Sequence, residues 1–224
     1  MDRLYSKSLI SRYLLLIVVF LLASCASSRY ETYTEPRTAV ASWYGADFHG
    51  RPTASGEKFD MYGLTCAHKE LPFGTVLQVT NTKNDRTVRC VVNDRGPFVS
   101  GRDLDLSYAA AKEIGLVGKG TAIVKILSLG RESGYVREVK YVPSGGPYTI
   151  QVGAFIEMEN ALRLKEALEL KYKDVYIIEG TVNEGIFYKV RIGKFQSRNE
   201  ASSVGKVLAY EGYSPLITHY DERA

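Results

Sequence analysis

An internal repeat in the last third of the chain constrains its fold more than any other feature of the sequence. Residues 148–177 align with residues 188–217 at a shift of forty, with apolar, glycine and aromatic residues at matching positions. Each copy has the pattern of a strand, a helix and a second strand, and Ser197 with Glu200 forms a capping box before the second helix. Two copies in tandem predict an α+β, ferredoxin-like βαββαβ domain, in which both helices cover one face of a four-stranded sheet.

Alternation along the strands separates the two faces of that sheet. Ile150 and Val190 are expected to face the helices, which leaves Gln151 and Arg191 on the open face. A polar and partly aromatic face suits a polymer laid across it. The simpler interpretation is that these amide and charged groups are only solvated.

The first residues of the chain predict export. Residues 1–12 carry three basic residues against one acidic residue, and an apolar run from Tyr13 to Leu22 follows. The run is too short to cross a bilayer as a mature helix, and the combination is typical of a signal peptide.

The end of this segment, with the letters LASC, resembles the lipobox of bacterial lipoproteins, whose cysteine becomes the acylated N-terminus. The resemblance implies that residues 1–24 are removed and that Cys25 is lipidated, which anchors the chain to a membrane on the periplasmic side of the cell envelope. Ala26 stands where inner-membrane lipoproteins often have Asp, and so favours the outer membrane. An ordinary signal peptide with a chance cysteine is the alternative.

The net charge and the number of cysteines restrict the kinds of ligand and of covalent or metal site that the chain can have. The net charge of +4 becomes +2 without the leader, which holds three Lys/Arg and one Asp, so no basic field remains for nucleic acid. With Cys25 lipidated, Cys66 and Cys90 remain, and two cysteines in an oxidising compartment most simply form a disulfide. A Cys-x-His zinc site at Cys66 and His68 is an alternative that lacks enough ligands. The sequence indicates no metal and no organic cofactor.

Changes in pattern divide the rest of the chain into two domains. Residues 25–38 are a polar tether, and residues 39–130 show short β-type runs between turn residues, with one helix that Ser107 caps. These runs predict a compact all-β barrel. Residues 131–146 predict a linker, although the letters YVREVKYV within it are also compatible with an edge strand, and the repeat domain covers residues 147–221.

Four blocks of the barrel segment closely resemble the rare lipoprotein A family and occur in that family's order. They are ASWYGADFHGRPTASGE (41–57), TCAHKELPFGT (65–75), VNDRGPF (92–98) and RDLDLSYAAA (102–111). The resemblance implies a double-psi β-barrel, a fold shared with expansins and certain cellulases. The repeat domain, with VGAF and RIGKF, resembles a SPOR domain, a peptidoglycan-binding module of division-site proteins. That resemblance implies a preference for glycan strands stripped of stem peptides, with division-site proteins as partners.

The family resemblance implies lytic transglycosylase activity. Such enzymes cleave the β-1,4 bond between N-acetylmuramic acid and N-acetylglucosamine and leave a 1,6-anhydro end, so one carboxyl group can serve first as acid and then as base. Asp94 matches the family's acid, and Glu57 and His68 match its other active-site positions, where they position the sugar or raise the pKa of the acid. Taken alone, Asp94 is equally a turn residue that bonds its own backbone. Asp105 is expected to be a structural acceptor outside the catalytic set.

The first predicted strand carries two aromatic residues that suit sugar stacking. Trp43 and Tyr44 are adjacent, so alternation places them on opposite sides of the strand and at most one lines the cleft. Core packing is the alternative for either. On the repeat domain, Gln151 and Arg191 are the predicted sugar contacts.

Two other functions stay open on the sequence alone. A non-catalytic barrel would grip glycan as expansins do, and a hydrolase would use Glu57 as a base for water. The complete set of Glu57, His68 and Asp94 favours the enzyme, because a barrel that only binds sugar needs no acid. A Cys66–Cys90 bridge would join the strand that carries His68 to the strand that carries Asp94, and many family members have Ala in place of Cys66.

Overall fold

The computed structural model describes residues 33–143, 145–182 and 185–221. The described residues all belong to one compact unit. The expected signal peptide and Cys25 therefore lie outside the described residues. Within the described ranges, no helix is both long enough and apolar enough to cross a membrane.

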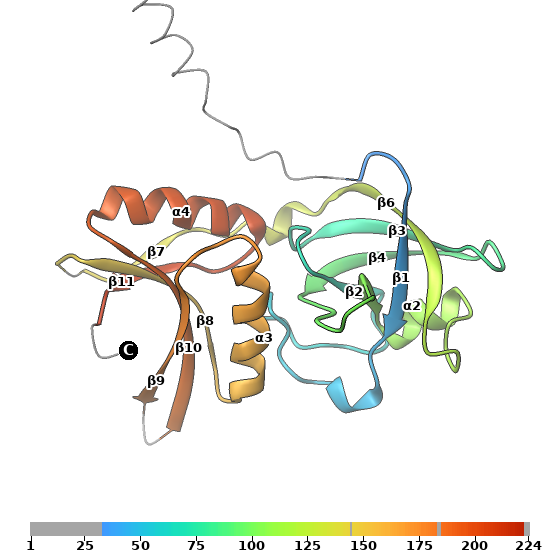
Figure 1. Ribbon diagram of the computed structural model, residues 1–224, viewed down its shortest axis with the longest axis horizontal. Helices are drawn as coiled ribbons and strands as arrows, with labels where there is room; N and C mark the ends of the chain where they lie inside the picture. The colour runs from blue at the N-terminus through green and yellow to red at the C-terminus, as the bar shows by residue number, and fades with distance from the viewer. Residues whose placement is uncertain (1–32, 144, 183–184, 222–224) are drawn as a thin grey trace, which may run out of the picture. The chain divides into compact units, whose positions relative to one another are not determined.

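Six strands of the first domain close into a barrel in the order β1-β5-β2-β4-β3-β6 (Figure 1). β1 pairs in parallel with β5, and β2 pairs in parallel with β4, whereas the other neighbours are antiparallel. This is the double-psi β-barrel expected for the all-β domain. The strands are β1 (Arg37–Trp43), β2 (Thr65–His68), β3 (Thr75–Asn81), β4 (Thr87–Asp94), β5 (Leu104–Leu106) and β6 (Ala122–Arg131).

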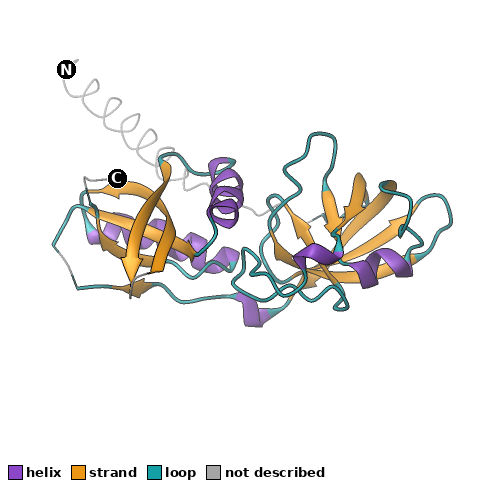
Figure 2. Cartoon of the chain, turned by 90° about the horizontal axis from the view of Figure 1, so that it is seen from below, coloured by secondary structure: helices purple, strands orange, loops and turns teal. Residues whose placement is uncertain are grey.

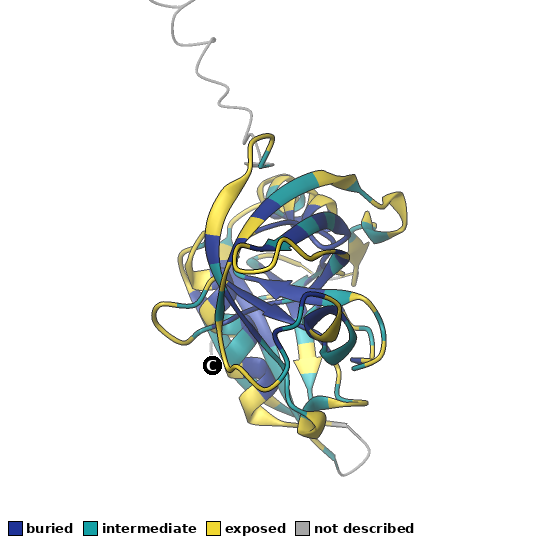
Figure 3. Ribbon diagram, turned by 90° about the vertical axis from the view of Figure 1, so that its right-hand side faces the viewer, coloured by how far each residue is buried: buried dark blue, intermediate teal, exposed yellow. Residues whose placement is uncertain are grey.

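Alternation fills the barrel with apolar side chains. Leu77 and Val79 of β3 are fully buried, as are Leu104 and Leu106 of β5, and the loops at the rim are exposed (Figure 3). Two short helices lie in the connections, the 3-10 turn η1 (Ala46–Phe48) and α2 (Tyr108–Glu113). Ser107 accepts a hydrogen bond from the Ala110 N–H at 3.2 Å, so the predicted cap of α2 is confirmed.

The second domain is a five-stranded sheet in the order β7-β11-β8-β10-β9, with α3 and α4 packed on it (Figure 2). The repeat accounts for four strands and both helices. The fifth strand, β7, pairs in parallel with β11, which confirms the edge strand that the sequence left open. The elements are β7 (Lys140–Tyr141), β8 (Tyr148–Phe155), α3 (Met158–Glu169), β9 (Val175–Val182), β10 (Gly185–Phe195), α4 (Arg198–Glu211) and β11 (Leu216–His219), and the 3-10 turn η2 (Ser133–Tyr135) precedes them.

The alternation of buried and exposed side chains along β8 is interrupted by a register shift in its pairing with β10. Ile150 and Val190 are fully buried, as expected for residues beneath the helices. The shift lies between Val190 and Arg191, opposite Gly153 and Gln151. A Cβ at Gly153 would lie 2.8 Å from Leu164 of α3, so Gly153 faces the helices where simple alternation from Gln151 predicts the open face. The next residue, Ala154, is exposed.

Candidate active site

Asp94 is the last residue of β4, and three donors hold its carboxyl group. The N–H groups of Ala54 and Arg95 both donate to Oδ1 at 2.8 Å, and the Tyr44 hydroxyl donates to Oδ2 at 3.2 Å. Burial raises the pKa of Asp94 above its ordinary value, and the three hydrogen bonds offset only part of that rise. A raised pKa favours the protonated carboxyl group, and the three donors lie where they can solvate the carboxylate once its proton is given up.

A tight turn before β2 places the Ala54 N–H within hydrogen-bond distance of Asp94. The Thr53 N–H donates to the Glu57 carbonyl at 2.7 Å, and the Gly56 N–H donates to the Thr53 carbonyl at 3.0 Å. Gly56 has φ +90°, a left-handed conformation that favours glycine. The same turn therefore fixes the backbone of Glu57 and the donor to Asp94.

Tyr44 follows β1 and contributes its hydroxyl group to the site. Its ring packs against Phe48 and Phe59, with centroids 5.4 and 5.0 Å away. Burial, followed by the negative charge of Asp94, raises the pKa of Tyr44 well above its ordinary value, so the phenol remains a donor. Trp43 instead packs against Tyr108 of α2, with ring centroids 5.9 Å apart. The structure thus brings Tyr44 to the acid and places Trp43 elsewhere.

Glu57 is anchored to the residue that precedes the acid. Its Oε2 accepts a hydrogen bond from Asn93 Nδ2 at 2.9 Å and from the Tyr135 hydroxyl at 3.1 Å. Burial, then the hydrogen bond to Glu57, raises the pKa of Tyr135. Tyr135 lies in η2, in the segment predicted as a linker, and sequence reasoning missed it. The Glu57 side chain is therefore held by Asn93, the residue of β4 that directly precedes Asp94.

His68, at the end of β2, is buried and electrically neutral. Its Nδ1 accepts hydrogen bonds from the N–H groups of Glu70 and Leu71, both at 3.1 Å, so the ring proton lies on Nε2, which meets the Tyr33 hydroxyl at 3.1 Å. Burial, followed by the positive charge of Arg95, lowers the pKa of His68 to about 3. This geometry suits a residue that shapes the turn after β2 rather than one that transfers a proton.

Arg95, the residue after Asp94, ties the end of β4 to the second domain, a role that sequence reasoning missed. Arg95 is 3% exposed, and its guanidinium carbon lies 3.7 Å from the centroid of the Phe73 ring. Nη1 donates to the Leu71 carbonyl at 2.9 Å, and Nε donates to the hydroxyl of Tyr213, after α4, at 2.7 Å. Because the Arg95 N–H also holds Asp94, this packing fixes one donor of the acid.

Cys66 and Cys90 lie side by side in the barrel core. Their Sγ atoms are 2.9 Å apart, both residues are 1% exposed, and both are free thiols in this structure. Burial raises the pKa of the Cys66 thiol well above its ordinary value. The pair joins neighbouring strands β2 and β4, and the predicted disulfide stays a prediction. Among the described residues, no three His, Cys, Asp or Glu side chains form a group that could hold a metal ion.

The two predicted sugar contacts of the second domain differ in access. Gln151 and Arg191 lie opposite each other on β8 and β10, and Tyr176 of β9 lies opposite Arg191 on its other side. Arg191 is only 8% exposed, and its Nε and Nη1 have no hydrogen-bond partner among the described residues. Gln151 is half-buried and lines a cavity. Of the two, Gln151 is the group that a ligand can reach.

Comparison with known proteins bears on both domains. Residues 37–126 match the family described as lytic transglycolase, and residues 144–218 match the SPOR domain family. A protein named endolytic peptidoglycan transglycosylase RlpA from Campylobacter jejuni is 34% identical over 80% of this chain and 70% of that protein. The protein of the same name from Vibrio cholerae is 37% identical over 82% of this chain and 69% of that protein. The chain belongs to the RlpA family.

Membership in the RlpA family confirms the resemblance to rare lipoprotein A proteins and to a SPOR module. The RlpA protein of Helicobacter pylori strain J99 is 38% identical over 72% of this chain. This chain covers 58% of that relative's length.

Proposed function

We propose that the chain is an endolytic lytic transglycosylase that cleaves the glycan strands of peptidoglycan. The observation that carries this proposal is the setting of Asp94, a carboxyl group with a raised pKa and three fixed donors. RlpA relatives named endolytic peptidoglycan transglycosylase support the same reaction. Its direct test is the chemical nature of the product ends, with Asp94→Asn as the inactive variant.

The geometry supports a mechanism in which one carboxyl group acts twice. Protonated Asp94 gives its proton to the glycosidic oxygen, and the bond from that oxygen to C1 of the muramic acid breaks. The C6 hydroxyl of the same sugar attacks C1, and its proton returns to the Asp94 carboxylate. Between these steps, the donors from Ala54, Arg95 and Tyr44 stabilise the carboxylate. No water nucleophile takes part.

Glu57 and His68 are proposed to position the acid rather than to react. Glu57 holds Asn93, the residue before Asp94, at 2.9 Å. His68 is neutral, with Nδ1 already occupied by two backbone donors. Neither contact needs a change of protonation during the reaction.

Tyr44→Phe is expected to slow the reaction and to move its pH dependence. Activity falls as the pH rises through the pKa of Asp94, because the acid must be protonated, and the Tyr44 hydrogen bond lowers that pKa. Removing the hydroxyl therefore shifts the alkaline limb of the kcat profile to higher pH. It should also lower kcat roughly tenfold, because the transient carboxylate loses a charge-assisted hydrogen bond. An alkaline limb that stays in place or moves to lower pH would contradict this role for Tyr44.

The SPOR module is proposed to hold peptide-free glycan on the open face of its sheet, through Gln151, with the buried Arg191 beside it on β10. The SPOR match and the position of Gln151 on a cavity support this. Recruitment to the division site, and to partner proteins there, is proposed from the SPOR resemblance.

Export and lipid anchoring through Cys25 are proposed from the sequence of residues 1–25. Cys25→Ser is expected to abolish incorporation of radiolabelled palmitate and to release the chain from the outer-membrane fraction. Its control is Ser203→Ala, at an exposed position of α4, which leaves both the lipobox and the buried cysteines intact. Palmitate incorporation that survives Cys25→Ser, or an unaltered chain that takes up none, would refute the anchor.

A further inference from the structure

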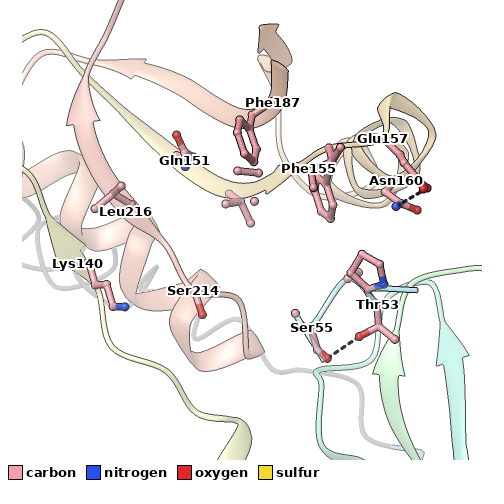
Figure 4. Close-up of a pocket in the computed structure, with 17 residues that line it drawn as sticks. Thr53, Ser55, Lys140, Gln151, Phe155, Glu157, Asn160, Phe187, Ser214 and Leu216 are labelled. Carbon is pink, nitrogen blue, oxygen red and sulfur yellow. Dashed lines mark hydrogen bonds between the residues drawn. The ribbon is translucent and has the colours of Figure 1, made fainter. Parts of the chain in front are cut away.

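A cavity of about 680 Å³ has walls from both domains (Figure 4). Residues 52–56 of the barrel form one wall, and they belong to the same turn that presents Glu57 and the Ala54 N–H. Gln151, Phe155 and Phe187 of the sheet form the opposite wall, together with Leu216. Ala154 of β8, which is exposed, also faces this space.

The walls have the chemistry of a sugar site. Phe155 and Phe187 offer ring faces on which the C–H face of a sugar can stack. Gln151 and Asn160 add amide groups, and Ser55 adds a hydroxyl, all of which can pair with hydroxyl and acetamido groups. Charged groups are few, so the site suits a polymer bound by stacking and hydrogen bonds. Its volume is within the range of pockets that enclose small ligands, roughly 300–1,000 Å³.

The cavity adjoins the acid. Residues 52–54, Phe155 and Asn160 also line a narrow cleft of about 10 Å³ that extends to Asp94. The volume of that cleft corresponds to about one water molecule, so it is a narrow connection between the cavity and Asp94. The large cavity therefore lies beside the cleavage site and does not contain it.

We infer that this cavity is an extended glycan subsite, built jointly by the barrel and the SPOR sheet. This inference rests on the proposed function. Its occupant is a peptide-free segment of the strand being cut, next to the sugars at the scissile bond. The SPOR sheet then serves as part of the enzyme's substrate-binding groove, in addition to acting as an anchor on the wall. Strands long enough to fill the cavity are cleaved more efficiently than strands that reach only the barrel.

The test compares kcat/KM for long peptide-free strands with kcat/KM for a peptide-free tetrasaccharide. Ala154→Glu places a longer, negative side chain in the cavity, beside a strand whose muramic acids carry free carboxylates. The ratio of the two kcat/KM values is expected to fall about tenfold, equivalent to the loss of one or two good contacts. Ser203→Glu, at an exposed position of α4 outside the cavity, is the matched control and should keep the ratio.

Gln151→Ala is a second variant that adds no bulk or charge, and it should lower the ratio about threefold through one lost hydrogen bond. A ratio that equals the unaltered chain's in both cavity variants would overturn the extended subsite while leaving the proposed activity intact. An unaltered chain that cleaves neither substrate would overturn the proposed function, and the subsite with it.

Discussion

Asp94→Asn is expected to lower the turnover of peptide-free glycan strands by roughly 10²–10⁴-fold, the usual contribution of a general acid/base. The amide has nearly the same shape as the carboxyl group, but it neither donates the proton to the glycosidic oxygen nor accepts one from the C6 hydroxyl. Turnover is measured from soluble products released over time at saturating substrate. The Ala54 and Arg95 N–H groups that now meet Oδ1 can still meet the amide oxygen.

Binding separates this loss of chemistry from a loss of structure. The variant should sediment with peptide-free glycan as the unaltered chain does, because the SPOR sheet is untouched. Asp105→Asn is the matched control: Asp105 is a buried carboxyl whose hydrogen bond and ion pair go to Ser42 and Arg102 rather than to Asp94. It should lower stability more than turnover per folded molecule. An Asp94→Asn variant that keeps more than about a tenth of the activity would remove Asp94 from the catalytic role.

Removing the cysteine pair is expected to have the largest effect on stability. In the exported chain, we propose that the two thiols become a disulfide, with two electrons and two protons passing to a disulfide-bearing thiol oxidase of the envelope. The bond would close a loop of 24 residues, which is worth roughly 3 kcal/mol of unfolding free energy by restriction of the unfolded chain. Cys66→Ala with Cys90→Ala should lower the denaturant midpoint accordingly.

Reduction supplies the control for that experiment. Dithiothreitol should destabilise the unaltered exported chain by nearly the same amount and leave the double variant unchanged. Peptide mapping that finds both thiols free in the exported chain would refute the disulfide. The bond would lie between β2 and β4, which carry His68 and Asp94, so the loss of stability should be accompanied by a lower kcat at elevated temperature.

The sequence predicted the features that depend on local residue pattern. It did not predict the features that depend on contacts between segments far apart in the chain. The repeat predicted four strands and two helices because each copy is a local unit with its own apolar face. The edge strand β7 remained open because a two-residue strand has too little pattern of its own. Alternation placed Ile150 and Val190 beneath the helices but did not predict the burial of Arg191 next to the register shift, which arises from pairing between strands that are far apart in the sequence.

The candidate site shows the same division. The family blocks pointed to Asp94 and Glu57, whereas Tyr44 was predicted as a stacking or core aromatic and its hydrogen bond to Asp94 was not foreseen. Tyr135 and Tyr213 were missed, since each is an ordinary residue of its own segment and gains a role only where the chain brings it to Glu57 or Arg95. The neutral state of His68 likewise follows from its burial and from the nearby charge of Arg95, which its sequence neighbours do not reveal.

The central claim is the chemistry at Asp94, and mass spectrometry of digestion products tests it most directly. The soluble chain from residue 26 is incubated with peptide-free strands, beside the Asp94→Asn variant. The account predicts fragments that end in 1,6-anhydro-muramic acid, lighter by one water than hydrolysis products, and none from the variant. Reducing ends would identify a hydrolase that uses water, and strands that are bound but remain uncut would identify a glycan-binding protein; either result would contradict the account.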